Sequence, residues 1–594
     1  MARFRSDTFA RMLLVATSIG TLGAALSTGA SAARAQPEVE ASGYGNRCAA
    51  FRTQMQGHWP DHTTRITALS YVPLGKAPAP DPRQFHYDAN AILKAHCDLQ
   101  AVMAERTGVD GQHYAIKFHL RLPLDWNGRF LFQGGGGTNG DVGNAIGATA
   151  GVGLSVPALT QGYAVVSQDS GHDNAVNTDP AKGGAAAFGH DPEARRNYAY
   201  ASLKAVTDAA KAAIGVFYAR APLYSYFAGC SKGGQEGMAI AHRYPHEFNG
   251  IVAAAPGMSL PRAALAQTWD ARAFGRLLPT SATGMPAFDT FPGVFSRSDF
   301  DLVRTVVLKA CDAADGLADG IVSRYGTCTD AVVLPVLRAA TCTGAKTAQC
   351  LSREQVDTLR QSLAGPRHRN GAPIYASFPW DGGIGQPGWA VWKVGLAEGV
   401  PPLSVVVGGP ALATIFQTPP EPLSPDPRDI LRWQMAFDFD GNADAIYRHA
   451  PPFQESGWET MSARSDDIDG FRAAGGKLIV PQGAADPVFS LNDTLQWYRD
   501  VDRRFHGGAA TTVRVFPVPG MNHCEGGPAT DQTNAFAALV AWVEHGRAPD
   551  QLDGSASQSS PWPGRKRPIC RFPKYARYDR HGDIEKEGSF TCAI

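Results

Sequence analysis

The chain has 594 residues, with 55 Lys and Arg against 55 Asp and Glu, and 44% of its residues are hydrophobic. Such a balance gives no electrostatic basis for binding nucleic acid or an acidic membrane surface. It also excludes wholesale disorder, so the function has to be read from local sites.

The amino terminus is predicted to be a secretory signal peptide over residues 1–35. A basic segment through Arg11 precedes an apolar stretch at 12–26, and the small residues up to Ala35 fit a cleavage site. The stretch is too short and too broken by glycine and serine for a membrane anchor. An amphipathic first helix is the alternative. We expect a secreted or periplasmic protein without a membrane anchor.

Residues 114–256 alternate strand-like and helix-like runs, which is typical of a parallel, doubly wound α/β sheet. The predicted strands are 129–133, 163–167, 224–228 and 250–255, and later 476–480 and 512–516. The predicted helices are 199–218, 234–244 and 534–546.

Residues 258–465 lack this rhythm and hold six Trp and four Cys. We therefore predict an α/β domain over 36–257 that is interrupted by a large inserted lid domain (258–465, the insertion) and completed over 466–594.

Ten cysteines and no zinc-type spacing predict five disulfides in an exported protein. Loop-closure entropy favours pairing between sequence neighbours. The four local pairs that this predicts are Cys48 with Cys97, Cys311 with Cys328, Cys342 with Cys350, and Cys570 with Cys592. Cys230 and Cys524 remain, and we predict that they pair with each other. Two free thiols, or a bridge from either one to a cysteine of the insertion, are the alternatives.

A nucleophile elbow is predicted at Ser231. Gly229-Cys230-Ser231-Lys232-Gly233 matches the G-x-S-x-G pattern, with a predicted strand before it and a predicted helix after it. The pentapeptide alone is a weak signal in a glycine-rich chain, for which an ordinary glycine turn is the alternative. The flanking strand and helix strengthen it.

The predicted acid and base follow Ser231 in the order that this architecture requires. Asp486 comes after the strand that ends at Val480, and His523 comes after the strand that ends near Val518. The carboxyl ends of parallel strands are where such sheets place functional groups. The rivals are Asp493 and Asp500 as the acid and His172 as the base.

The oxyanion hole is predicted to combine the amide of Lys232 with an amide from the glycine run 134–137. A dinucleotide-binding interpretation of these glycines fails, because their spacing is not G-x-G-x-x-G.

Three motifs together resemble the tannase and feruloyl esterase family, which includes the bacterial mono(2-hydroxyethyl) terephthalate hydrolase. They are the run 227–234 around Ser231, the run 519–524 around His523, and the Asp-rich loop from Asp312. The resemblance covers essentially the whole mature chain and implies an α/β-hydrolase with a large lid that cleaves esters of aromatic acids. It also implies a Ser231–Asp486–His523 triad, oxyanion amides from Gly137 and Lys232, and Phe489 lining the acyl pocket.

The Asp-rich loop is predicted to hold a structural Ca²⁺ ion. Asp312, Asp315 and Asp319 offer carboxylates and Leu317 and Ile321 offer carbonyls, which suits a cation that takes about six to eight oxygen ligands. It is not an EF-hand, because its twelfth position is Ser323, and a solvated Asp-Gly turn is the alternative. The family resemblance, which includes a calcium ion in the lid, favours the site.

The predicted function is hydrolysis of feruloyl, galloyl or similar phenolic esters through an acyl-enzyme. Between Arg369 and Arg428 the only basic residue is Lys393, whereas the terephthalate-monoester branch of the family carries an arginine in this part of the lid. We therefore expect a neutral ester as substrate. The alternatives are mono(2-hydroxyethyl) terephthalate hydrolysis, a serine peptidase or acyltransferase, and a non-catalytic binding protein with this fold.

Overall fold

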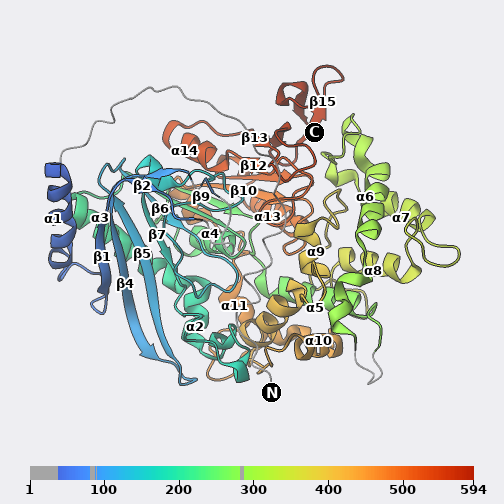
Figure 1. The fold of residues 1–594 in the computed structure, drawn as a ribbon, viewed down its shortest axis with the longest axis horizontal. Coiled ribbons are helices and arrows are strands. Elements are labelled where there is room, and N and C mark those ends of the chain that lie inside the picture. Colours follow the sequence, from blue (N-terminus) through green and yellow to red (C-terminus); the bar gives the residue numbers. More distant parts are fainter. Residues whose placement is uncertain (1–37, 80–86, 89, 281–285) are drawn as a thin grey trace, which may run out of the picture.

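A computed structural model describes residues 38–79, 87–88, 90–280 and 286–594 (Figure 1). The predicted signal peptide, residues 1–35, lies outside the described residues. In the described part of the chain, no helix has both the length and the apolar character needed to cross a membrane.

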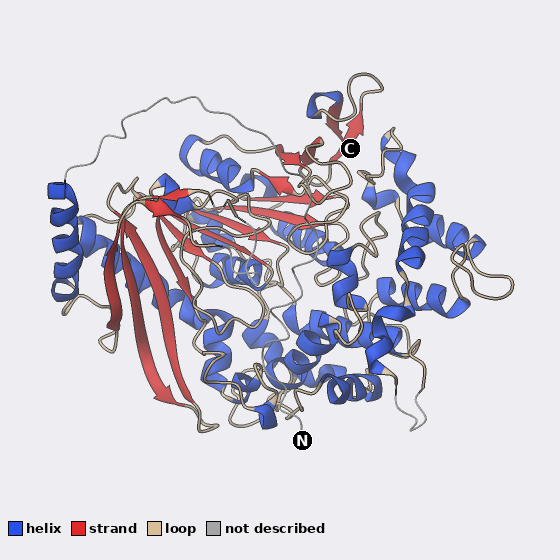
Figure 2. Ribbon diagram, viewed as in Figure 1, coloured by secondary structure: helices blue, strands red, loops and turns tan. Residues whose placement is uncertain are grey.

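A nine-stranded mixed sheet forms the centre of the molecule, and Figure 2 shows helices on both of its sides. The strand order is β1-β4-β5-β7-β6-β8-β9-β10-β11. The pairings from β7 through β11 are parallel, and those among β1, β4, β5 and β7 are antiparallel. The bounds are β1 Arg65–Val72, β4 His96–Thr107, β5 His113–Pro123, β6 Arg129–Gln133, β7 Ala164–Gln168, β8 Tyr224–Cys230, β9 Gly250–Ala254, β10 Lys477–Gly483 and β11 Val513–Val518.

Helices cover both faces of this sheet because its central strands are buried on both sides. One face packs against α1 Glu38–Gln54, α3 Ser202–Tyr218, α4 Lys232–Arg243 and α13 Leu491–Arg504. The other face packs against α14 Ala535–His545. Two further short helices are α2 Pro192–Arg196 and α12 Asp469–Ala473.

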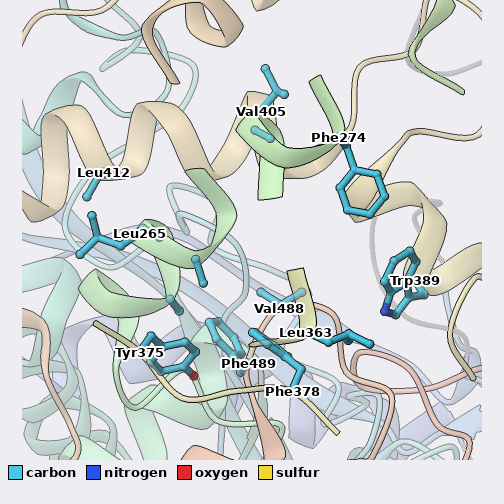
Figure 3. Close-up of a cluster of buried hydrophobic side chains, with 14 of the residues drawn as sticks. Leu265, Phe274, Leu363, Tyr375, Phe378, Trp389, Val405, Leu412, Val488 and Phe489 are labelled. Carbon is cyan, nitrogen blue, oxygen red and sulfur yellow. The ribbon is translucent and has the colours of Figure 1, made fainter. Parts of the chain in front are cut away.

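The insertion lies between β9 and β10, and its described residues contribute no strand to the central sheet. Its helices are α5 Leu260–Gly275, α6 Arg297–Cys311, α7 Asp330–Ala339, α8 Arg353–Ala364, α9 Pro387–Lys393, α10 Pro427–Ala436 and α11 Gly457–Met461. They pack around a hydrophobic core that also includes Phe188 and Tyr198 from outside the insertion. Val488 and Phe489, from the segment after β10, join that core beside Tyr375 and Phe378 (Figure 3). The insertion is therefore packed onto the loops at the edge of the sheet.

The predicted strands are confirmed with shifts of at most three residues at their ends, and so is the mostly parallel α/β-hydrolase sheet. The predicted domain boundaries at 258 and 465 stay a prediction. Strands β1, β4 and β5 were not predicted, nor were the short strands β2 Gly75–Lys76, β3 Ile92–Leu93, β12 Gln532–Thr533, β13 Gln551–Ser555, β14 Lys566–Cys570, β15 Tyr575–Tyr578 and β16 Phe590–Ala593. Strands β2, β3 and β12 are two residues long, and strands of that length leave no periodic pattern in a sequence.

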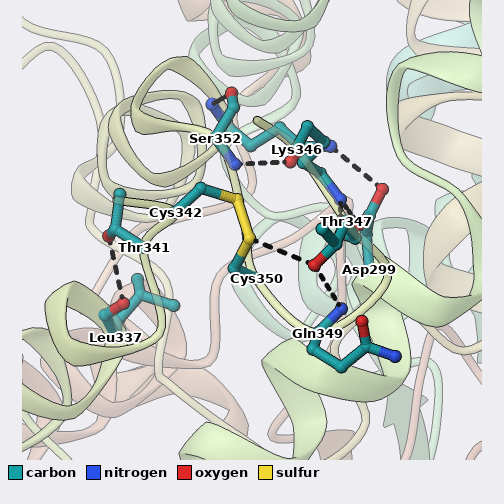
Figure 4. The surroundings of a disulfide bond; sticks show 10 residues. Asp299, Leu337, Thr341, Cys342, Lys346, Thr347, Gln349, Cys350 and Ser352 are labelled. Atoms are coloured by element: carbon teal, nitrogen blue, oxygen red, sulfur yellow. Dashed lines mark hydrogen bonds and ion pairs between the residues drawn. A yellow bond between two sulfur atoms is a disulfide. The ribbon is translucent and has the colours of Figure 1, made fainter. Parts of the chain in front are cut away.

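All five predicted disulfides are confirmed. They are Cys48–Cys97, Cys230–Cys524, Cys311–Cys328, Cys342–Cys350 and Cys570–Cys592. Four of them close short loops within one part of the chain. Figure 4 shows the Cys342–Cys350 bond in the insertion, near the ion pair between Lys346 and Asp299. The exception is Cys230–Cys524, which joins residues 294 positions apart.

The remaining disulfides outside the insertion stabilise the two ends of the described chain. Cys48 of α1 is bonded to Cys97 of β4, which attaches the first helix to the antiparallel part of the sheet. Cys570 of β14 is bonded to Cys592 of β16, which ties the last strand to the carboxyl-terminal segment before it. Both bonds lie outside the region where the predicted catalytic residues meet.

Candidate active site

Ser231 occupies a sharp turn between β8 and α4. Its φ of 64° and ψ of −118° lie in a strained region that a non-glycine residue adopts only when its surroundings enforce it. This is the geometry of a nucleophile elbow, which lifts the hydroxyl above the carboxyl edge of the sheet.

The elbow needs glycine on both sides. A Cβ atom added to Gly229 would lie 2.6 Å from the carbonyl carbon of Gly233. One added to Gly233 would lie 2.6 Å from the carbonyl oxygen of Gly135. The two glycines thus let the turn close on itself and let it touch the segment 134–140, the glycine loop, which follows β6.

Asp486 and His523 meet at the ends of neighbouring strands β10 and β11. Nδ1 of His523 lies 2.9 Å from Oδ2 of Asp486, and the other carboxylate oxygen accepts hydrogen bonds from the amides of Val488 and Phe489. The Asp486 side chain is fully buried. Nε2 of His523 is buried and has no hydrogen-bond partner in the described part of the chain, which leaves it free to act on a neighbouring hydroxyl.

The disulfide between Cys230 and Cys524 connects the elbow to the histidine. Cys230 precedes Ser231 and Cys524 follows His523, and the two Cα atoms are 6.1 Å apart. The bond therefore holds the serine and histidine backbones side by side, although Ser231 lies in the turn after β8 and His523 lies in the loop after β11.

The two predicted oxyanion residues line one cavity together with Ser231 and Phe489. Neither the amide of Gly137 nor that of Lys232 donates a hydrogen bond to an acceptor in the described part of the chain. Lys232 opens α4, where the first amides of a helix have no intrahelical partner. Both amides are therefore available to an oxyanion.

A buried acidic residue that the sequence analysis missed, Glu236, holds the glycine loop in place. It accepts hydrogen bonds from the amide of Gly135 (2.9 Å), from Nδ2 of Asn139 (2.9 Å) and from Nζ of Lys232 (3.0 Å). Lys232 and Glu236 are four residues apart on α4, so their pairing was the one signal available in the sequence.

The Lys232 ammonium also lies 4.5 Å from the ring centroid of Tyr198. Tyr198 in turn donates a hydrogen bond to the carbonyl of Gly137 at 3.2 Å. Burial lowers the pKa of Lys232, and the Glu236 carboxylate opposes that shift. The Lys232 side chain is thus engaged by Glu236 and Tyr198.

The cavity wall opposite the elbow is apolar and comes mainly from the insertion. It is formed by residues that include Leu260, Ala263 and Ala264 of α5, Trp392 of α9, and Ala411 and Phe416. The rings of Phe489 and Trp392 both lie edge-on to the His523 imidazole, with centroids 5.4 and 5.9 Å away. Such a wall suits a flat aromatic group.

The insertion also contacts the segment 484–490, which carries Asp486 and is called the acid loop. Nζ of Lys393 is ion-paired with Asp270 of α5 and donates to the carbonyl of Pro487 at 2.7 Å. Both charged side chains are at most 2% exposed. The Lys393 ammonium is therefore already paired within the protein and is not exposed to bind a ligand.

The rival acids, Asp493 and Asp500, and the rival base, His172, make contacts with other residues than the predicted triad. Asp493 accepts from Ser259 and pairs with Arg464, and Asp500 pairs with Arg464 as well. His172 is buried and stacked on Phe188 at 3.8 Å, and burial lowers its pKa to about 3. In the described part of the chain neither ring nitrogen of His172 has a hydrogen-bond partner, whereas Nδ1 of His523 is held by the Asp486 carboxylate.

The Asp-rich loop is folded over its own backbone amides. Asp312 accepts from the amide of Gly320, and Asp315 accepts from those of Leu317 and Ser323. Asp319 accepts from the amide of Ile321 and is ion-paired with Arg567.

No group of three or more His, Cys, Asp or Glu side chains in the described part of the chain is arranged to hold a metal ion. The predicted calcium site therefore stays a prediction.

Residues 100–593 match the family described as tannase and feruloyl esterase. The chain belongs to this family. Among curated relatives, a mono(2-hydroxyethyl) terephthalate hydrolase from Piscinibacter sakaiensis is 39% identical, with 90% of this chain and 89% of the relative covered. A probable feruloyl esterase B-1 from Aspergillus flavus is 25% identical, with coverage of 92% and 95%.

Family membership agrees with the fold of a solved relative. The crystal structure of feruloyl esterase B from Aspergillus oryzae superposes with a TM-score of 0.67 at 21% identity, covering 91% of this chain and all of that one. At this identity the likeness shows the shared fold, and it extends over the insertion as well as the sheet.

Proposed function

We propose that the protein is a serine carboxylesterase that hydrolyses neutral esters of aromatic, phenolic acids. The observation that carries the proposal is the Asp486–His523 pair, tied through the Cys230–Cys524 bond to the Ser231 elbow at one apolar cavity. The family, whose named members are esterases, supports the same reaction class.

In the proposed mechanism, Nε2 of His523 takes the proton of the Ser231 hydroxyl as Oγ attacks the ester carbonyl. Asp486 holds the imidazole by accepting from Nδ1–H and stabilises its charged form. The amides of Gly137 and Lys232 donate to the developing oxyanion. His523 then returns the proton to the departing alcohol, and a water molecule, activated by the same histidine, releases the acid.

A second candidate is suggested by the relative that is 39% identical and named as a mono(2-hydroxyethyl) terephthalate hydrolase. That substrate carries a free carboxylate, which arginine recognises best through its two parallel N–H donors. In the described part of the chain no arginine lines the cavity. Lys232, a cation that does line it, is paired with Glu236, so we rank neutral esters first.

We expect methyl ferulate or methyl gallate to be turned over with a higher kcat/KM than mono(2-hydroxyethyl) terephthalate, because the cavity offers no arginine to a carboxylate in the part of the chain that is described. A panel that also contains chlorogenate and para-nitrophenyl butyrate measures this ranking. The reverse order would favour the second candidate. No turnover of any ester, without labelling of Ser231 by a fluorophosphonate, would favour a non-catalytic protein.

We propose further that the Asp-rich loop binds a structural Ca²⁺ ion through Asp312, Asp315 and Asp319 and the carbonyls of Leu317 and Ile321. In support, Oδ1 of Asp312 is buried without a partner among the described residues. Burial also raises the pKa of Asp312, and it raises that of Asp315 to about 6, with the charge of Asp319 adding to both shifts. A divalent cation would offset the repulsion between the carboxylates of Asp312, Asp315 and Asp319 and would stabilise the loop within the insertion.

Removal of calcium is expected to lower the Tm by several degrees, since a ligand at about 100 times its Kd stabilises the folded state by about 2.7 kcal/mol. Differential scanning fluorimetry with EDTA, followed by Ca²⁺ or Mg²⁺, measures the shift. Asp312→Asn should abolish it, and Asp357→Asn on the exposed face of α8 should not. A Tm that is indifferent to Ca²⁺ in the wild type would contradict the site.

The five disulfides indicate a protein that folds in an oxidising compartment outside the cytosol. We propose that it is secreted or periplasmic, with residues 1–35 as its signal peptide. We also propose that the insertion acts as a fixed lid domain, because Lys393 and Asp270 hold it to the acid loop.

A further inference from the structure

One buried polar side chain in the cavity wall, Gln267, has an unpaired atom among the described residues, and the proposed mechanism does not use it. Gln267 lies on α5, is 3% exposed and lines the same cavity as Ser231 and Phe489. Its Oε1 atom is buried and accepts no hydrogen bond in the described part of the chain. An unsatisfied buried acceptor is costly, so it calls for an explanation.

The orientation of this amide is determined by its neighbours. Nε2 of Gln267 donates to the carbonyls of Pro487 (3.3 Å) and Val488 (3.4 Å) in the acid loop. An amide turned the other way would bring its oxygen against those two carbonyl oxygens. The acceptor oxygen therefore faces away from the acid loop.

The backbone of the insertion leaves Gln267 little freedom to move. A Cβ atom added to Gly408, which also lines the cavity, would lie 2.5 Å from Cβ of Gln267. Close packing against Gly408 thus restrains the base of the Gln267 side chain, and two hydrogen bonds restrain its amide nitrogen. A fixed acceptor of this kind can select a ligand by its hydrogen-bond donor.

The His523 side chain provides a precedent within the same site. Its Nε2 is likewise buried without a partner among the described residues, and it is the atom that the proposed reaction brings into contact with Ser231 and the substrate. Two such polar atoms thus belong to residues at this site, one on the histidine above the elbow and one on the wall formed by the insertion.

We propose that Oε1 of Gln267 accepts a hydrogen bond from the ring hydroxyl of the acyl group, and so selects esters of hydroxylated aromatic acids. The inference rests on the proposed function and deepens it. A phenol is protonated at neutral pH and donates one hydrogen bond, which matches an amide oxygen that has no donor. A substrate carboxylate is acceptor-only at that pH and would oppose the same oxygen.

The test compares methyl 4-hydroxycinnamate with methyl cinnamate, which lacks only the hydroxyl. The wild type should favour the hydroxylated ester by at least about tenfold in kcat/KM, because the analogue leaves the acceptor unpaired. In Gln267→Met, which keeps the length of the side chain, the ratio should fall to within about twofold of unity. Loss of the Nε2 bonds to the acid loop slows both esters, and the ratio cancels that common effect.

Gln434→Met is the matched control. Gln434 lies on α10, is fully buried, and donates to the carbonyl of Ser404. Its Oε1 also has no partner in the described part of the chain, but Gln434 is not among the residues that line the cavity. This variant should keep the wild-type ratio even if it loses stability.

Equal kcat/KM for the two esters in the wild type would overturn the inference and leave the esterase proposal standing. A ratio in Gln267→Met that equals the wild-type ratio would also overturn it. A wild type that hydrolyses neither ester and is not labelled by a fluorophosphonate would remove the proposed function and the inference together. The wild-type comparison alone tests the proposal if Gln267→Met fails to fold.

Discussion

Ser231→Ala is expected to lower kcat by about four orders of magnitude or more, while the Tm and circular dichroism spectrum stay close to those of the wild type. Members of a triad act as a unit, so loss of the nucleophile removes nearly all of the rate enhancement that the triad supplies. The fold should survive because the substitution leaves the flanking glycines and their contacts around the strained elbow (φ 64°) unchanged.

The measurement is steady-state hydrolysis of methyl ferulate, with fluorophosphonate labelling followed by mass spectrometry. His523→Ala should show a loss of similar size, and Ser559→Ala, at an exposed position, should show none. Retention of more than a few per cent of activity by purified Ser231→Ala would reject Ser231 as the nucleophile.

The second large effect is expected when Cys230 and Cys524 are both replaced by serine. In the chain-entropy model, the loop of 294 residues that this bond closes contributes about 6 kcal/mol to the free energy of unfolding. Activity should also fall by at least about tenfold below the Tm, since an error of about 1 Å between Ser231 and His523 can cost about a hundredfold in rate.

A matched control removes a different disulfide. The Cys342–Cys350 bond spans 8 residues, and neither cysteine lines the active-site cavity (Figure 4). Its double serine variant should lose less stability and retain wild-type kcat at temperatures well below its Tm. If the Cys230→Ser/Cys524→Ser variant kept full kcat under the same conditions, the bond would be a stabilising link without influence on the register of serine and histidine.

The candidate triad could be proposed from the sequence because each member leaves a local pattern. Ser231 lies between two glycines at the end of an apolar strand, and Asp486 and His523 each follow another such strand. Parallel strands bring their carboxyl ends to one edge of the sheet, so three local patterns in the right order sufficed to predict one site. The Cys230–Cys524 bond was predictable for the same reason, since each cysteine adjoins a predicted triad residue.

The groups that support the site were not predictable in this way. Gln267 contacts the acid loop more than 200 residues further along the chain, and Lys393 reaches the same loop from another helix of the insertion. Glu236 is near Ser231 in sequence, but its contact with Gly135 spans about 100 residues. No spacing rule links such positions, because the packing of the insertion decides which side chains meet.

The sequence by itself predicted the candidate reaction centre: the elbow and the order of serine, acid and base follow from strand periodicity and short-range stereochemistry. Loop closure predicted four of the five disulfides, and the fifth followed from the positions of Cys230 and Cys524 beside predicted triad residues. Only the tertiary structure decided the shape and polarity of the acyl cavity. Its wall joins α5 and α9 to the acid loop. Among the described residues the Oε1 atom of Gln267 has no partner, while two carbonyls hold the amide nitrogen. Which atoms are left unpaired after burial depends on all neighbours at once, and that is a property of the folded chain alone.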